Sequence, residues 1–133
     1  MKNKVVVALL MAAGLLALSS AVSAHHSAAG LFSPDVEKTL TGTVKQWLFV
    51  NPHPAIVMEV KTNQGVDTWR IQFPATAGLS RRFGWTRNSI KPGDEIKILG
   101  NPYLDDHKVM FPLIVTLPDG KGYTVREPRT APE

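Results

Sequence analysis

Four histidines are the side chains of this 133-residue chain best suited to bind a metal ion: His25, His26, His53 and His107. His25 and His26 directly follow Ala24, where the preceding segment ends in small residues typical of a signal cleavage site. Cleavage after Ala24 would make His25 the first residue, with an α-amine and an imidazole on one residue. An α-amine has an ordinary pKa of about 8, and imidazole is a favoured ligand of Cu(II). The sequence therefore predicts a copper chelate at a processed N-terminus.

A third nitrogen from another histidine would complete a tetragonal site of the kind known as a histidine brace. We expect His53, which lies between two prolines, to supply this nitrogen, and His107, which follows two aspartates, is the other candidate. The side chain of His26 would point away from that of His25 in an extended chain. Plainer interpretations stay open: a solvated histidine pair at the N-terminus, a turn role for His53, and a solvent-exposed His107 at a hairpin tip.

Three arginines around a tryptophan form a second constellation, made of Arg81, Arg82, Trp85 and Arg87. Forked guanidinium donors beside an aromatic face could bind an anionic glycan, a lipid head group or a protein of the cell envelope. The alternative is a solvated helix end, where positive charges are favourable without any ligand. We expect the helix-end role, and keep the anion-binding surface as the alternative function.

The first 24 residues have the three parts of a Sec-type signal: Lys2 and Lys4, an apolar run over residues 5–18, and small residues before His25. An apolar run of about 14 residues is shorter than the roughly 20 that cross a bilayer as a helix. We therefore expect a periplasmic or secreted protein without a stable membrane anchor. The chain contains no cysteine, so no disulfide contributes to its stability.

Charge and motifs narrow the class of function. Without the signal, 13 Lys and Arg face 11 Asp and Glu, and this small excess gives little reason to expect a polyanion partner. Export also makes nucleic acid an unexpected partner. The sequence has no cysteine nucleophile, no Gly-x-Ser-x-Gly elbow and no His-Glu-x-x-His motif. We expect a binding protein rather than an enzyme.

Alternating apolar residues between turn signals predict strands over most of the remaining chain. We expect an N-terminal arm over residues 25–35, one domain over 36–127 and a flexible tail over 128–133. The expected strands are 37–50, with a bend at Gly42, then 55–61, 66–73, 95–99 and 108–117. A short segment at 123–125 follows, and a helix over 75–83 ends at Gly84. This order predicts an all-β fold, a small five-stranded antiparallel OB-like barrel with one short helix. The side chains expected inside it are Ile56, Met58, Trp69, Ile71, Ile96 and Ile98.

Several short motifs carry a resemblance to a known family: His-His-Ser at 25–27, Leu-Thr-Gly-Thr-Val at 40–44, Asn-Pro-His at 51–53, the arginines before Gly-Trp-Thr-Arg at 84–87, and Lys-Pro-Gly-Asp at 91–94. On these motifs the chain is similar to an uncharacterised, domain-of-unknown-function family of small exported bacterial proteins whose mature N-terminus begins His-His-Ser. Phe83 and Pro54 depart from the family pattern. The resemblance implies an OB-like fold and an exported location, and it supplies no activity.

Overall fold

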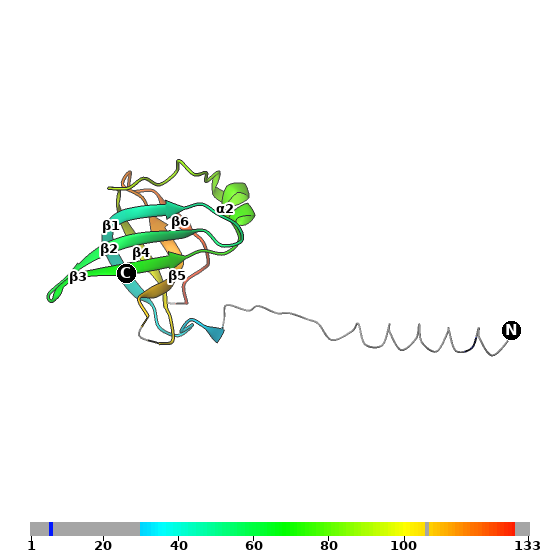
Figure 1. Ribbon diagram of the computed structural model, residues 1–133, viewed down its shortest axis with the longest axis horizontal. Helices are drawn as coiled ribbons and strands as arrows, with labels where there is room; N and C mark the ends of the chain where they lie inside the picture. Colours follow the sequence, from blue (N-terminus) through cyan, green and yellow to red (C-terminus); the bar gives the residue numbers. More distant parts are fainter. Residues whose placement is uncertain (1–5, 7–29, 106, 130–133) are drawn as a thin grey trace.

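The structure is a computed structural model, and it describes residues 6, 30–105 and 107–129. The described strands and helix follow one another along the chain as β1 (Lys38–Leu48), β2 (Ala55–Thr62), β3 (Gly65–Gln72), α2 (Thr76–Phe83), β4 (Glu95–Pro102), β5 (Val109–Thr116) and β6 (Gly122–Thr124). The helix between β3 and β4 has the predicted place in this order (Figure 1). His25, His26 and most of the predicted signal lie outside the described residues. No helix within the described ranges is both long and apolar enough to cross a membrane.

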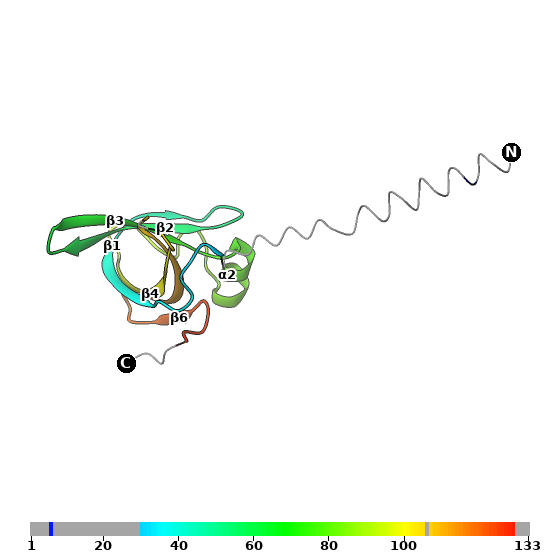
Figure 2. The same ribbon diagram turned by 90° about the horizontal axis from the view of Figure 1, so that it is seen from below.

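Five strands close into a barrel, and β6 adds to its outer side. The strands pair in the order β3-β2-β1-β4-β5-β6, and an additional pairing of β3 with β5 closes the ring. Figure 2 shows the strands curving around the core, with the β2–β3 hairpin extending past the barrel wall. The closed five-stranded barrel with a helix after its third strand confirms the predicted OB-like fold.

The closing pair corrects one part of the prediction, because β3 and β5 run parallel through Arg70–Val109 and Ile71–Met110. All the other pairings in the sheet are antiparallel. The reason is geometric: neighbours around a ring can alternate in direction throughout only if the number of strands is even. A closed barrel of five strands must therefore contain a parallel pair.

Strand β1 belongs to both sides of the barrel. It pairs with β4 from Lys38 to Thr43 and with β2 from Thr43 to Leu48, so it passes from one partner to the other beside Gly42. A Cβ atom at Gly42 would overlap the carbonyl oxygen of Glu59 on β2. Glycine therefore allows a close backbone approach of β1 to β2, whereas the irregularity in the pairing of β1 with β2 lies between Val44 and Gln46 rather than at the predicted bend.

The predicted interior residues form the core. Ile56, Met58, Trp69, Ile71, Ile96 and Ile98 are all at most 8% exposed, which confirms the prediction. They lie on the inward face because successive side chains of a strand point to opposite sides of the sheet. At one end of the barrel the core continues into an aromatic cluster of Trp47, Phe49, Phe73, Phe83, Trp85 and Tyr123.

Strand β4 is longer than its sequence pattern predicted. We expected it to end before Gly100, but it continues to Pro102 through a register shift between Leu99 and Gly100. A Cβ atom at Gly100 would lie 2.5 Å from the carbonyl oxygen of Phe111. This glycine therefore serves a close approach of β4 to β5 rather than a strand end.

Candidate functional site

The loop between β4 and β5 carries one of the four histidines in a defined arrangement. The Oδ1 atom of Asp105 lies 2.7 Å from Nδ1 of His107 and accepts a hydrogen bond from its backbone N–H at 3.1 Å. The imidazole contacts the ring of Tyr103 edge-on, with the ring centroids 6.1 Å apart. The side chain of His107 is 76% exposed, so its remaining ring nitrogen, Nε2, is open to a ligand.

A polar hollow of about 390 Å³ lies against this loop. It is lined by Lys38 at the start of β1, by Asp67 and Trp69 of β3, and by residues 102–105, 107 and 108. The ammonium of Lys38 lies 4.9 Å from the centre of the Trp69 ring, and Lys108 forms an ion pair with Asp67. The charged groups of this wall are therefore largely engaged with one another.

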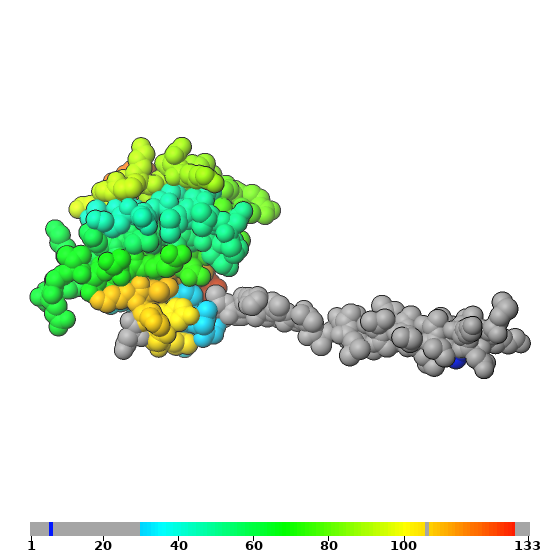
Figure 3. Space-filling model, in the orientation of Figure 1, coloured from blue at the N-terminus to red at the C-terminus, as the bar shows by residue number. Residues whose placement is uncertain are grey.

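The N-terminal arm is docked directly beside the same loop. The backbone N–H of Leu104 donates to the carbonyl of Leu31 at 2.9 Å, and the N–H of Ser33 donates to the carbonyl of Pro102 at the same distance. Between these two hydrogen bonds, Phe32 and Tyr103 form an isolated antiparallel β-bridge, and the centroids of their rings are 5.1 Å apart. Figure 3 shows the arm and the loop side by side on the surface.

This docking was not predicted from the sequence, and it is the structural feature most relevant to the histidines. Phe32 is only 6% exposed, and it packs in a small apolar cluster with Phe111 and Leu113. Phe32 and Leu31 are the two large apolar residues of the predicted arm, and this pair was the available signal. The centroid distances place the rings of Phe32 and His107 at most about 11 Å apart. The described part of the arm therefore contacts the barrel close to His107.

His53 lies on the exposed loop between β1 and β2, next to the start of α2. The hydroxyl of Thr76 donates to the carbonyl of Val50 at 2.9 Å, and the backbone N–H of Phe73 donates to the carbonyl of Pro54 at 2.9 Å. These bonds hold the loop on both sides of the histidine. Among the described residues, no side chain hydrogen-bonds the imidazole of His53. Its ring is therefore presented to solvent on a well-anchored loop.

No backbone hydrogen bond joins the described part of the arm to the loop of His53. Four pairings connect the arm to β2, in the order Phe32–Tyr103, Tyr103–Val109, Val109–Arg70 and Arg70–Val57. At a spacing of about 4.8 Å, these steps cover about 19 Å along the curved sheet, and the four residues back to His53 add about 13 Å along the strand. This path along the sheet is longer than the direct backbone contact that joins the arm to the loop of His107.

Two of the three arginines in this constellation form hydrogen bonds with backbone carbonyls of the fold. Arg82 donates to the carbonyls of Thr124 and Val125 at 3.0 and 2.9 Å, which ties α2 to β6. Arg81 donates to the carbonyl of Ala77 within α2. Arg87 is exposed. The expected helix-end role therefore describes Arg81 and Arg82 better than a shared anion site does.

The aromatic member of that constellation corrects the sequence interpretation. Trp85 is 2% exposed and packs edge-on against Trp47, Phe73 and Tyr123. Its ring is part of the core and offers no face to a ligand at the surface. Trp85 follows the glycine that ends the helix, and the sequence around it did not indicate whether its side chain points outward or inward.

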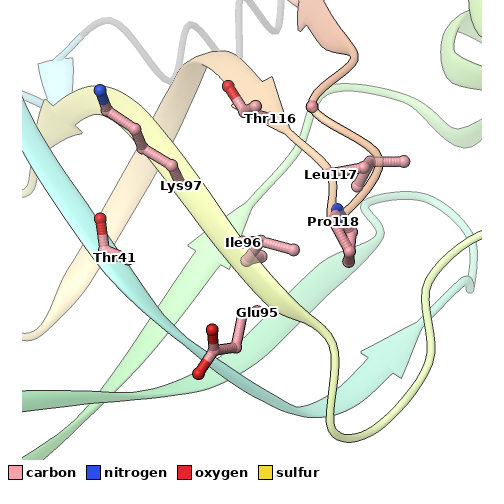
Figure 4. Close-up of a pocket in the computed structure, with 8 residues that line it drawn as sticks. Thr41, Glu95, Ile96, Lys97, Thr116, Leu117 and Pro118 are labelled. Carbon is pink, nitrogen blue, oxygen red and sulfur yellow. The ribbon is translucent and has the colours of Figure 1, made fainter.

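Two further hollows contain none of the candidate histidines. One of about 360 Å³ lies over β1, β4 and the end of β5, with Glu95 and Lys97 at its rim and Leu117 in its wall (Figure 4). The other, of about 180 Å³, lies between the arm and the C-terminal segment. There Arg129 donates its backbone N–H to Glu37 at 2.6 Å and forms an ion pair with Asp35. Arg129 is thus tied to the barrel, although we expected a flexible tail from residue 128.

The fold and the loop define a class: a small OB-like barrel that presents an aspartate-bound histidine beside its docked N-terminal arm. Within the described ranges, no three His, Cys, Asp or Glu side chains gather as a ready metal site. The chain belongs to DUF6152, a family of unknown function, whose model matches residues 12–110. That range extends from the predicted signal into the start of β5. A comparison with curated proteins gave no match.

Proposed function

We propose that this protein is exported to the periplasm and there binds Cu(II) through the amine and imidazole of a processed His25, with His107 as the third nitrogen donor. The observation that carries the proposal is the docking of residues 31–33 on residues 102–104, next to the loop of His107. The proposed role is binding rather than catalysis.

The place where the arm docks supports His107 over His53 as the partner. Seven residues separate His25 from Phe32, and they span at most about 24 Å when fully extended. His107 lies well inside that radius. The arm is hydrogen-bonded to the segment that leads to His107, and no backbone hydrogen bond joins its described residues to the loop of His53. A chelate that leaves the arm slack costs less conformational entropy, and this favours the histidine beside which the arm docks.

The ligand chemistry supports copper. The α-amine is a base with an ordinary pKa of about 8, so a metal can displace its proton near neutral pH. Three nitrogen donors in one plane suit the tetragonal preference of Cu(II), which also stands highest among the divalent first-row metals in affinity for such sites. His26 would point away from the chelate in an extended segment and is not assigned as a ligand.

The decisive experiment compares Cu(II) affinity and nitrogen ligation across matched forms of the purified protein. The forms are the processed protein, the same protein with one extra residue before His25, His25→Ala, His107→Ala and His53→Ala. A competition titration measures affinity, and electron paramagnetic resonance reports the number of coordinated nitrogens. We expect the extended form and His25→Ala to lose high-affinity binding, because the amine becomes an amide or the first imidazole is missing.

The two loop histidines serve as controls for each other. His107→Ala should lose one coordinated nitrogen and bind more weakly, whereas His53→Ala should match the unaltered protein. The reverse pattern would assign the third nitrogen to His53. Affinity should also fall on acidification, because protons compete for the amine and both rings. Equal affinity of the processed and extended forms would overturn the copper proposal.

A further inference from the structure

Asp105 holds the imidazole of His107 at one nitrogen. Its Oδ1 lies 2.7 Å from Nδ1, and the same oxygen accepts the backbone N–H of His107 at 3.1 Å. A lone pair on Nδ1 at this distance would repel the carboxylate oxygen, which accepts hydrogen bonds but donates none when ionised, so the contact favours the tautomer with the proton on Nδ1. The neutral imidazole then has its lone pair on Nε2, on the side of the ring away from Asp105.

We propose that Asp105 is a positioning residue, which fixes the Nδ1–H tautomer of His107 and so presents Nε2 to the metal. This inference rests on the proposed function for its metal and on the described loop for its geometry. Carboxylates that accept the second ring N–H of a ligating histidine fix its tautomer and orientation and make it a stronger donor. The edge contact with Tyr103 restrains the same ring from a second direction.

The other charges around the hollow do not compete for this role. Lys108 is adjacent in sequence but forms its ion pair with Asp67, and Lys38 lies over the Trp69 ring. Within the described part of the chain, no other carboxylate forms an ion pair with the imidazole. Asp105 is therefore the acceptor that decides which nitrogen of His107 carries the proton.

The first test requires no metal. Long-range proton–nitrogen NMR spectra of the metal-free processed protein, at a pH where His107 is neutral, show which ring nitrogen is protonated. We expect Nδ1–H in the unaltered protein. Asp105→Ala should shift His107 toward Nε2–H, which an unconstrained histidine favours, and Asp105→Asn should keep part of the Nδ1–H population through its amide oxygen. Asp119→Ala is a matched control, because Asp119 also accepts a loop backbone N–H, from Lys121 at 2.9 Å.

The second test uses Cu(II) alone as the probe. Asp105→Ala should weaken binding by about 10- to 100-fold, the usual effect of removing such a partner, while electron paramagnetic resonance still reports three nitrogens. Asp105→Asn should recover part of the loss, and Asp119→Ala should bind like the unaltered protein. An Nε2–H tautomer in the unaltered protein, or no change in tautomer and affinity for Asp105→Ala, would overturn the role of Asp105. Failure of the copper proposal would be recognised separately, by equal binding of the processed and extended forms.

Discussion

Replacing Phe32 by alanine should both destabilise the domain and loosen the arm that carries His25. The ring is 6% exposed and contacts those of Tyr103 and Phe111 at centroid distances of 5.1 and 5.8 Å. A buried Phe→Ala change costs about 3–5 kcal/mol, and the small cluster at the barrel rim can collapse in part, so we expect about 3 kcal/mol. For a domain of this size each kcal/mol lowers Tm by about 4–8 °C, which gives a fall of roughly 12–24 °C.

The effect of Phe32→Ala on copper follows from the length of the tether. With the arm docked, its first anchor is Leu31, six positions after His25, whereas with residues 31–33 undocked the next backbone anchor is Val36, eleven positions after His25, whose carbonyl accepts a hydrogen bond from Asn101 at 2.9 Å. Effective concentration falls roughly as the −3/2 power of tether length, so Cu(II) should bind about 2.5-fold more weakly.

Thermal unfolding followed by circular dichroism, together with the competition titration, measures both effects. Leu31→Ala is the matched control, because Leu31 is 46% exposed and its backbone bond to Leu104 is retained. We expect this control to change stability by less than about 0.5 kcal/mol. A Tm for Phe32→Ala equal to that of the control would refute the docking of the arm in solution.

Three further predictions test the barrel, the arginines and the processing. Gly42→Ala should destabilise the domain by about 1–3 kcal/mol in a denaturant titration, because its Cβ would overlap the Glu59 carbonyl. The control Gly78→Ala in α2 should be neutral or stabilising by up to about 1 kcal/mol, because nothing lies within 4 Å of the added Cβ. Similar losses of stability for both variants would contradict the close approach at Gly42. Arg82→Ala should lower the free energy of unfolding by about 1–2 kcal/mol, because its two hydrogen bonds to backbone carbonyls are lost. Replacing the exposed Arg87 by alanine should change it by less than about 0.5 kcal/mol. Equal effects of the two variants would show that Arg82 does not hold α2 against β6. Mass spectrometry of the exported protein should find His25 as its first residue, and a later first residue would remove the chelating amine.

Much of the fold could be predicted from the sequence, because the relevant signals are local. Alternation of apolar residues assigned Ile56, Met58 and Ile71 to the inner face, since side-chain direction along a strand repeats every two residues. Gly84 was expected to end the helix, and it takes a positive φ of 68° there and donates to the carbonyl of Ser80. Such signals depend on a few neighbouring residues and need no knowledge of the rest of the chain.

The candidate site could be predicted only in its residue types. The sequence by itself identified four histidines, the chelating potential of His25 and the aspartates before His107. It gave no measure of the distance from the arm to either loop histidine, because that distance depends on how Phe32 docks on Tyr103, more than seventy residues later. For this reason the sequence favoured His53, while the contacts of the arm favour His107.

Only the tertiary structure decided which strands meet, what covers each aromatic ring and where the arm lies. The parallel β3–β5 pair follows from closing an odd number of strands, which no single strand records in its own pattern. Trp85 is inside because α2 and β6 place Phe83 and Tyr123 around it, not because of its immediate neighbours in sequence. Residue type and periodicity are local properties of the chain, whereas proximity and burial arise from contacts between distant segments, and those contacts bring the arm beside the aspartate-bound His107.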